Sequence, residues 1–371
     1  MSVKPVIKIG IVAGEHSGDR LGAGIIKALK SSVDIELFGV GGPQLSKEGL
    51  NSEFNFKKLQ VMGFIEPLMN FRELSNLRKG LIKLFLENEI DYFIGVDSPD
   101  FNMTIHKNMK KKNSSKNIQL VSPSVWGWRQ GRIKSIQKYI DLTICLFNFE
   151  HDFFQENNLP SIHLGHPFAT LERTSKDKVF DNFNLNIDKK YISILPGSRK
   201  SELKNMLPTY ISFMQKHFKK YPDYNYLIPA ADQVSKEFIE DSIPDDVPFL
   251  IGINCAKEFL SVSDYSVVTS GTASLEAAIL GCTPIICYKT STINYSIISR
   301  MLKVKHVGLP NLLLDSRIYP ELIQKDCSAD SIFNEAETMQ NARSNHNQEI
   351  YLRDLLSGIG YEEAAHKITL L

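Results

Sequence analysis

Residues 90–102 read IDYFIGVDSPDFN, and this segment decides the class of fold. It begins with a short, largely apolar run typical of a strand buried in a parallel sheet, and Ser98 and Pro99 end that run after a carboxylate. Asp97 is therefore predicted at the carboxyl end of a central strand, the edge at which open α/β sheets bind ligands. Alternatively, Asp97 has no role in chemistry and serves only as the cap of the helix that follows Pro99. Asp100 suits that capping role better, which leaves Asp97 available for chemistry.

The composition of the chain indicates a globular protein of two domains. A chain of 371 residues is longer than a domain with a single hydrophobic core usually is. Its contents of 43% hydrophobic and 23% charged residues are ordinary for globular proteins. A formal net charge of +1 gives no reason to expect a nucleic-acid partner. The five cysteines form no Cys-x-x-Cys pair, which favours free thiols in a reducing compartment. Without a signal-peptide pattern or a membrane-spanning apolar run, we expect a cytoplasmic protein whose membrane contact, if any, is peripheral.

Apolar strand-like runs alternate with helical patterns in both halves of the chain. This alternation predicts an α/β protein with two Rossmann-like parallel-sheet domains that face an interdomain cleft. We expect domains at residues 1–167 and 168–345, a polar linker at 168–190, and C-terminal helices at about 346–371 that cross back onto the first domain. Strands are predicted at residues 8–13, 35–40, 90–96, 118–121, 141–147, 191–195, 224–228, 249–251, 265–269 and 284–288.

The turn after the first predicted strand reads GEHSGD at residues 14–19. Its glycines allow a tight turn and a close approach of the backbone to a ligand or a neighbouring element. The spacing is not Gly-x-Gly-x-x-Gly, so a dinucleotide site is poorly supported. Glu15, Ser17 and Asp19 either cap the following helix or contact a ligand at the same edge as Asp97.

A second feature is an apolar segment at residues 61–72 that Gly63 and Pro67 interrupt. Such a segment is poorly suited to a core, and basic residues flank it, which favours a membrane-interface patch. The helix that follows is expected to be a core helix with a solvated basic face. The lysine-rich residues 107–112 are either solvated surface or add attraction to an anionic membrane. The residues predicted to contact the membrane are Phe64, Ile65, Leu68, Met69 and Phe71.

Both tryptophans of the chain lie in one strand-to-helix turn, residues 122–132, together with Arg129 and Arg132. Two large aromatic side chains and two arginines can form a structural cluster, or they can recognise a sugar or a phosphate.

In the second half, residues 269–276 read TSGTASLE between a predicted strand and a predicted helix. The start of a helix presents backbone N–H groups and a positive dipole end, which makes it an anion site, although a simple capping box would give the same pattern. Glu276 could accept from ribose hydroxyls, and Arg199, after the preceding parallel turn, could hold a diphosphate. The residues predicted to bind a nucleotide diphosphate are Ser198, Arg199, Ser270, Gly271, Thr272, Ala273, Ser274, Glu276 and Asn311.

Taken together, these motifs resemble the lipid-A-disaccharide synthases, which are inverting glycosyltransferases of the GT-B fold. The resemblance runs from residue 10 to about residue 325, and the motifs occur in the same order. They are AGEHSGD (13–19), VMG (61–63), GVDSPDFN (95–102), SPSVWGWRQGR (122–132), GHP (165–167), LPGSR (195–199), SGTASLE (270–276) and LPNLL (309–313).

The resemblance implies that UDP-2,3-diacylglucosamine and 2,3-diacylglucosamine 1-phosphate are joined to give UDP and the β-1,6 disaccharide of lipid A. Asp97 would then be the general base, and the acceptor side would be formed by Glu15, Ser17, Asp19, Trp126, Arg129 and Arg132. No metal and no other cofactor is expected. Acylated substrates imply work at the anionic inner face of the inner membrane, and the oligomeric state is not predicted.

Two other classes of function share parts of this pattern. A two-domain protein that acts on UDP-sugars without lipid, such as an epimerase, would have the anion site but no use for the apolar segment at residues 61–72. A non-catalytic nucleotide-binding module at a membrane would have both features. Activity on deacylated substrates would favour the epimerase-like class, and UDP release with both lipid substrates would exclude the non-catalytic one.

Overall fold

In the computed structural model, the chain forms two compact units, one of residues Met1–His166 with Leu356–Leu371 and one of Pro167–Leu355. The structure describes residues 6–52, 54, 71–112, 115–127, 130–290, 305–340 and 346–371. The predicted membrane-contacting residues 64–69 and Arg129 lie outside these ranges, and the side chain of Phe71 is likewise not described. No helix among the described residues is long and apolar enough to cross a bilayer.

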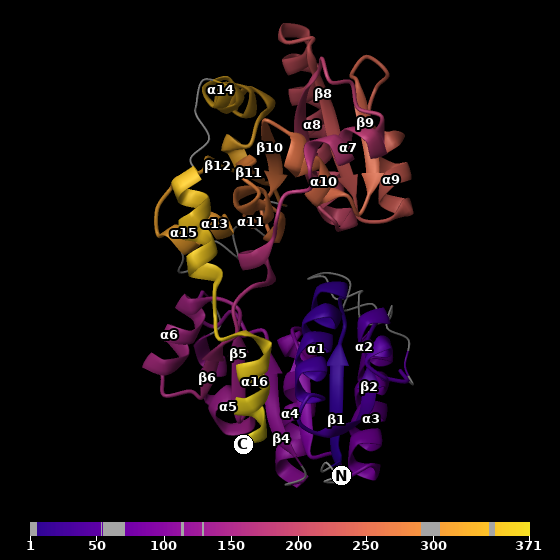
Figure 1. Ribbon diagram of the computed structural model, residues 1–371, viewed down its shortest axis with the longest axis vertical. Coiled ribbons are helices and arrows are strands. Elements are labelled where there is room, and N and C mark those ends of the chain that lie inside the picture. The colour runs from indigo at the N-terminus through magenta and orange to yellow at the C-terminus, as the bar shows by residue number, and fades with distance from the viewer. Residues whose placement is uncertain are drawn as a thin grey trace. The chain divides into compact units, whose positions relative to one another are not determined.

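The first unit is built on a parallel sheet with the strand order β2-β1-β3-β4-β5-β6 (Figure 1). Ala13 at the end of β1 is paired with Val96 at the end of β3, so the loops after these two strands start side by side. The strand order reverses direction between β1 and β3, which makes this edge the topological switch point of the sheet. The strands are β1 (Val6–Ala13), β2 (Asp34–Val40), β3 (Tyr92–Val96), β4 (Lys116–Leu120), β5 (Leu142–Cys145) and β6 (Ser161–His163).

Helices cover both faces of this sheet, as the apolar runs of its strands predict. One face packs on α1 (His16–Leu29) and α16 (Gly360–Thr369), and the other packs on α3 (Phe71–Glu87) and α4 (Pro99–Lys112). The two helices of the first pair lie against each other, and a Cβ atom at Gly24 would sit 2.5 Å from the Tyr361 ring. The remaining helices are α2 (Pro43–Lys47), α5 (Ile133–Tyr139) and α6 (Asn148–Glu156).

The second unit has its own parallel sheet, with the strand order β12-β11-β10-β7-β8-β9. Here the order reverses between β7 and β10, and Leu195 of β7 is paired with Val268 of β10. The loops that carry Arg199 and Ser270 therefore begin at the switch point of this sheet. The strands are β7 (Lys190–Leu195), β8 (Tyr224–Ala230), β9 (Phe249–Ile253), β10 (Tyr265–Thr269), β11 (Thr283–Tyr288) and β12 (Glu321–Ile323).

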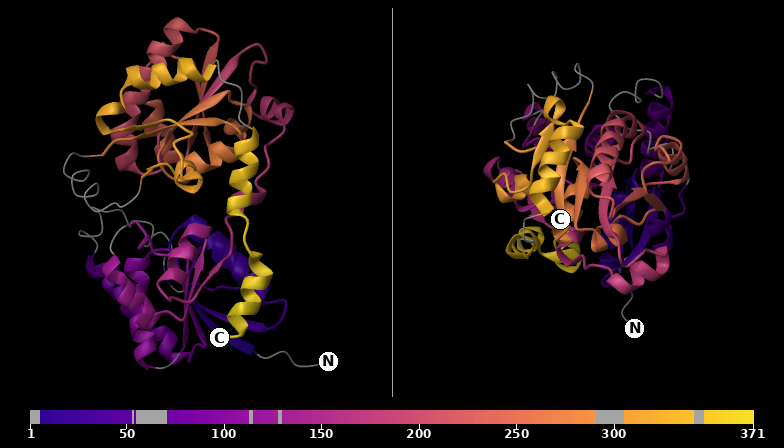
Figure 2. Two further views of the ribbon diagram at one scale, coloured as in Figure 1. Left: turned by 90° about the vertical axis from the view of Figure 1, so that its left-hand side faces the viewer. Right: turned by 90° about the horizontal axis from the view of Figure 1, so that it is seen from above.

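The main core of this unit lies between the sheet and two helices, α8 (Lys200–Lys220) and α14 (Ala329–Gln340). Smaller clusters on α7 (Lys176–Phe183), α10 (Ala256–Val262) and α11 (Thr272–Ile279) complete it. In the left view of Figure 2, the yellow-orange helix α14 lies against the pink and orange elements of this unit. The other helices among the described residues of this unit are α9 (Gln233–Glu240), α13 (Leu309–Leu314) and α15 (His346–Leu356).

Two details of the domain organisation differ from the sequence prediction. The segment predicted as a linker, residues 168–190, contains α7, whose Val179 is buried and whose Phe183 packs on Phe259 at 4.9 Å between ring centroids. The second difference concerns α15, which belongs to the second unit, whereas α16 belongs to the first. The guanidinium of Arg353 on α15 donates to the carbonyls of Ala169 and Ile279, and these bonds hold the helix there.

Candidate functional site

Asp97 lies directly after β3, at the switch point of the first sheet. Asp97 and Ser98 both have positive φ angles, 49° and 41°, a left-handed conformation that is unfavourable for residues with side chains. The Asp97 N–H donates to the Leu120 carbonyl (2.8 Å). Its own carbonyl accepts from the side-chain amides of Asn102 (2.8 Å) and Gln119 (3.0 Å). The backbone at the predicted general base is therefore held from β4 and from α4.

The loop after β1 brings Glu15 and Ser17 to the same edge of the sheet. Glu15 is the N-cap residue of α1 and is half-buried, and Ser17, in the first turn, is exposed. A Cβ atom at Gly18 would lie 3.1 Å from the side chain of Val96, so this turn of α1 packs on the end of β3. The structure thus brings together three of the predicted residues, because Asp97 is next to Val96 in the chain.

Asp19 has a different role from the predicted one. It is only 1% exposed, and its carboxylate accepts from the backbone N–H groups of Gly42 (2.8 Å), Gln44 (2.8 Å) and Leu45 (3.1 Å). These groups lie at the start of α2, where a helix has unpaired N–H donors. Asp19 therefore joins α1 to α2, and its buried carboxylate does not line an acceptor site.

The tryptophan turn is anchored to a buried carboxyl group that the sequence prediction missed. Trp126 is half-buried, and its indole N–H donates to Oε1 of Glu150 (3.3 Å). The other oxygen of Glu150 accepts from the backbone N–H groups of Leu146 (3.2 Å) and Phe147 (3.3 Å). Burial raises the pKa of Glu150 to about 7, although these hydrogen bonds favour the ionised form. Trp126 is thus fixed by a carboxyl group that titrates near neutral pH.

Arg132 lies beside the start of α4, because its guanidinium forms an ion pair with Asp100. Asp100 is in the first turn of that helix, three residues after Asp97. Arg132 is half-buried, with 26% of its side chain exposed, and it is the arginine of the tryptophan turn that the structure describes. This contact brings it to the edge of the sheet that carries Asp97.

In the second unit, Ser198 and Arg199 lie in the turn from β7 to α8. The N–H groups of both residues donate to Oε2 of Glu202 (3.0 and 3.2 Å), so this helix start is capped by its own side chain. The turn requires glycine at position 197, where φ is +110° and a Cβ atom would lie 2.6 Å from Glu202. The side chain of Arg199 is 59% exposed and 3.8 Å from Oε1 of Glu202. Arg199 is thus placed at the surface of the switch point.

The start of α11 is open in comparison. Gly271 is its N-cap residue, the structure assigns no side-chain cap there among the described residues, and Gly271 and Thr272 are exposed. Glu276, one turn further, is half-buried. Two of the predicted hydroxyl donors are already used, since Ser270 donates to the Val307 carbonyl (3.1 Å) and buried Ser274 to the Gly271 carbonyl (2.7 Å). The main chain at residues 271–273 and the exposed Thr272 are therefore what this helix start offers to an anion.

Asn311 is not available to a nucleotide, contrary to the prediction. Its side chain is fully buried, and its amide nitrogen donates to the carbonyl of Tyr319 (2.8 Å) and to Glu321 (2.9 Å). The amide oxygen accepts from the N–H groups of Ile318 (3.0 Å) and Tyr319 (2.9 Å). With its donors and its acceptor engaged, Asn311 holds α13 to the strand β12.

Solved structures of other proteins share the fold of this chain at low sequence identity. The glycotransferase of kitacinnamycin aligns with a TM-score of 0.63 at 10% identity, over 100% of this chain and 99% of that one. UDP-GlcNAc 2-epimerase from Neisseria meningitidis, bound to UDP-GlcNAc, aligns with a TM-score of 0.58 at 13% identity, over 99% and 98% of the two chains. The predicted GT-B fold is confirmed, but these likenesses do not separate a transferase from an epimerase.

Sequence relatives distinguish between a transferase and an epimerase. The family model described as lipid-A-disaccharide synthetase matches residues 9–369. The chain belongs to the lipid-A-disaccharide synthetase family. A curated relative, the lipid-A-disaccharide synthase of Acinetobacter baylyi, is 38% identical over 350 residues, which cover 90% of this chain and 88% of that one.

Membership of the lipid-A-disaccharide synthetase family confirms the predicted activity class: the chain is a glycosyltransferase of lipid A biosynthesis. In this member of the family, the residues that the prediction missed are polar groups beneath the site: the buried Asn102, Gln119 and Glu150 and the half-buried Glu321. A signal for one of them is present in the sequence, because Gln119 lies between Ile118 and Leu120 in β4, where an unpaired polar group would be costly. The other three lie in helices or at a short strand and carry no such signal.

Proposed function

We propose that this enzyme transfers the 2,3-diacylglucosamine of UDP-2,3-diacylglucosamine to the 6-hydroxyl of 2,3-diacylglucosamine 1-phosphate. The products are UDP and the β-1,6-linked disaccharide 1-phosphate of lipid A. The observation that carries this proposal is the family match over residues 9–369, which spans both units of the chain. The roles of individual residues are supported by their positions at the two switch points.

Asp97 is the proposed general base. Its carboxylate takes the proton of the acceptor 6-hydroxyl as that oxygen attacks C1 of the donor sugar. The bond from C1 to the diphosphate oxygen breaks, its electron pair leaves with UDP, and the configuration at C1 inverts. Support comes from the position of Asp97 at the carboxyl end of β3 and from the hydrogen bonds that fix its backbone.

The departing diphosphate is proposed to bind at the start of α11 and to Arg199. A helix start supplies backbone donors and a positive dipole end, and a guanidinium adds a full charge with paired donors. The exposed main chain at Gly271 and Thr272 and the exposed side chain of Arg199 support this assignment. Glu276 is assigned to the ribose hydroxyls, because it lies one turn into the same helix.

The acceptor is proposed to lie along the loops of the first unit, against Glu15, Ser17, Trp126 and Arg132. Arg132 would face the anionic 1-phosphate, for which a guanidinium is well suited. Support comes from the contacts of Gly18 with β3 and of Arg132 with Asp100, which lie at the same edge as Asp97. Arg129 is assigned to this side from the sequence alone.

Membrane contact is proposed for the apolar residues Phe64, Ile65, Leu68, Met69 and Phe71. Both substrates carry two acyl chains, and withdrawal of one chain from a bilayer costs about 0.8 kcal/mol per methylene. An enzyme that works at the anionic cytoplasmic face of the inner membrane avoids most of that cost. The basic flank of the segment would add electrostatic attraction.

The proposal is tested with a mass-spectrometric assay of defined donor and acceptor. We expect stoichiometric formation of the disaccharide 1-phosphate and UDP. The matched control replaces both substrates with their deacylated forms, for which we expect a much lower rate. Equal rates on both pairs, or conversion of the donor alone to an epimer, would support a soluble UDP-sugar enzyme instead. UDP binding without release of UDP from the donor would contradict any transferase.

A further inference from the structure

Two buried side-chain amides meet at the carbonyl of Asp97. Asn102 is 0% and Gln119 is 1% exposed, and both donate to that oxygen. The amide nitrogen of Gln119 also lies 3.3 Å from the Leu120 carbonyl and 3.2 Å from the Val121 carbonyl. Gln119 therefore connects the end of β4 to the left-handed turn after β3, and Asn102 connects the first turn of α4 to the same point.

The orientation of the Gln119 amide is fixed by His106. The Oε1 atom of Gln119 lies 3.1 Å from Nε2 of His106. Since the amide nitrogen faces carbonyl oxygens, Oε1 must accept, and His106 must carry its proton on Nε2. Burial lowers the pKa of His106 to about 4, so the ring is neutral at physiological pH. A neutral ring in this tautomer directs the NH₂ group of Gln119 towards Asp97.

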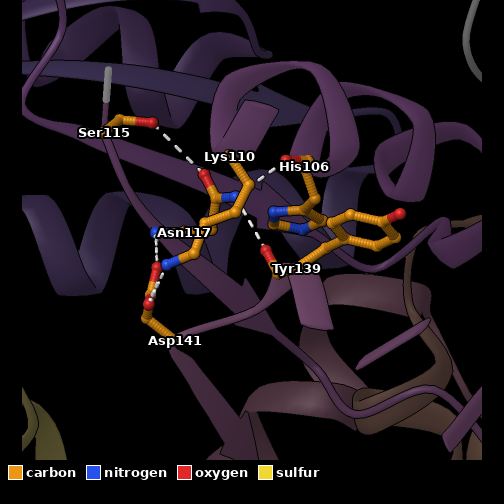
Figure 3. A network of polar contacts seen from close by, with 6 residues as sticks. All are labelled: His106, Lys110, Ser115, Asn117, Tyr139 and Asp141. Carbon is orange, nitrogen blue, oxygen red and sulfur yellow. Dashed lines mark hydrogen bonds and ion pairs between the residues drawn. The ribbon is translucent and has the colours of Figure 1, made fainter. Parts of the chain in front are cut away.

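The helix that carries His106 is itself tied to β4 (Figure 3). Asn117, two residues before Gln119 on the same face of the strand, donates to the carbonyls of His106 (2.8 Å) and Tyr139 (2.7 Å). The N–H group of Asn117 donates to Asp141 (2.8 Å), which also pairs with Lys110 on α4. Glycine at position 95 permits the close approach, because a Cβ atom there would lie 3.0 Å from Nε2 of His106.

We propose that Gln119 is a positioning residue for sugar transfer: with Asn102 it holds Asp97 in the left-handed conformation and so directs the carboxylate towards the acceptor hydroxyl. This inference rests on the proposed role of Asp97 as the base. The left-handed conformation at Asp97 and Ser98 is unfavourable for residues with side chains, so it needs bonds that a relaxed turn would lose. The two neutral side-chain amides that donate to the Asp97 carbonyl supply these bonds. Gln119 itself does not contact the substrate.

The test variant is Gln119→Met, which keeps the length of the side chain and removes its amide. We expect kcat to fall by roughly 10- to 100-fold, because a misplaced catalytic group is costly, while KM and UDP affinity stay within about twofold. The control is Ser161→Ala, which removes a buried hydroxyl of β6 that contacts His151 and Gln155 and belongs to no part of the network around Asp97. We expect this control to lose thermal stability and to keep kcat within about twofold of the wild type.

A double-mutant cycle separates positioning from general destabilisation. If Gln119 acts through Asp97, then adding Gln119→Met to Asp97→Asn leaves the residual kcat unchanged. A second drop of the same size, or an equal drop in Ser161→Ala, would overturn the inference, and so would an unchanged kcat in Gln119→Met. If Gln119→Met does not fold, Asn102→Ala removes the other donor and takes its place in the same cycle. Full activity of Asp97→Asn itself would refute the role of the base, and an inactive Asp97→Asn beside a fully active Gln119→Met would refute only the positioning role.

Discussion

The two sheets of this chain have the same number of parallel strands, but they present different chemistry at their switch points. In the first unit, the edge around β1 and β3 is occupied by side chains: carboxylates at positions 15 and 97 and an arginine at 132. In the second unit, the edge between β7 and β10 presents the main chain at the start of α11, with one exposed arginine nearby. The first edge is suited to proton transfer and the second to holding an anion.

This difference predicts which substitutions should change turnover and which should change nucleotide affinity. A proton acceptor is one atom of one side chain, so its function is lost with that side chain. An anion held by several backbone N–H groups depends on the path of the chain, so no single side chain should dominate its affinity. We therefore expect large effects on turnover at the first edge and small effects on nucleotide affinity at the second.

The largest effect is expected for Asp97→Asn, which removes the proposed base and keeps the shape of the side chain. We expect kcat to fall by about 10²- to 10⁴-fold with unchanged UDP affinity, measured by steady-state kinetics and calorimetry. The control is Asp91→Asn, because Asp91 lies at the opposite end of the same strand, where it accepts from the N–H group of Lys8. Equal losses in both variants would show that strand stability, and not base chemistry, sets the rate.

The next effect concerns Glu150, the carboxyl group behind Trp126. Its pKa in the folded protein, about 7, is above its ordinary value of 4.5, so the folded state binds the proton more tightly. The tighter binding of this proton stabilises the folded protein fully below the pKa that Glu150 has in the unfolded chain. The stabilisation is lost as the pH rises through 7. We expect Glu150→Gln to gain roughly 3 kcal/mol in unfolding free energy relative to the wild type between pH 4.5 and 8. Denaturant unfolding at pH 4.5 and at pH 8 measures this difference in unfolding free energy. The control is Glu156→Gln, a substitution of an exposed residue. A difference that does not change with pH would contradict the raised pKa.

Asp19 allows a second comparison at the first edge, between carboxylates with different roles. We assign a structural role to Asp19 and a catalytic role to Asp97. Asp19→Ala leaves three backbone donors at the start of α2 without their acceptor. We expect a loss of about 2 kcal/mol in unfolding free energy and a KM for the acceptor within twofold of the wild type. Asp34→Ala, an exposed residue at the start of β2, is the matched surface control. A raised acceptor KM in a stable Asp19→Ala variant would return this residue to the acceptor site.

The smallest effect is expected at the second edge, for Arg199→Ala. The start of α11 should retain most of the affinity for the diphosphate, so we expect the Kd of UDP to rise only about tenfold. Calorimetry on this variant and on Lys200→Ala, its exposed neighbour, gives the comparison. A rise of about a thousandfold would break the proposed contrast, because a side chain would then dominate at both edges.

The strands were largely predictable from the sequence, because buried parallel strands are short apolar runs ended by glycine, proline or serine. The ten predicted runs all correspond to strands of the two sheets. The two strands that were missed, β6 and β12, have three residues each, too few for a pattern. The helix α7 was missed because its polar residues resemble a linker, although Val179 is buried.

The candidate site was predictable at the level of strand ends and not at the level of side-chain partners. The position of Asp97 follows from the end of an apolar run, since strand ends define the edge of the sheet. The structural roles of Asp19 and Asn311 could not be predicted, because their partners lie 23 to 26 and 7 to 10 positions away along the chain. The raised pKa of Glu150 likewise depends on burial that no local pattern reports.

The return of α16 to the first unit has a consequence for biosynthesis. Its buried residues Ala364, Ala365 and Ile368 belong to the same apolar cluster as β1 and α1, which leave the ribosome first. The unit that is synthesised first is thus completed last, after the whole second unit has emerged. A nascent chain that stalls shortly before its end would expose this cluster along α1, so translation must finish before the amino-terminal half is protected from aggregation.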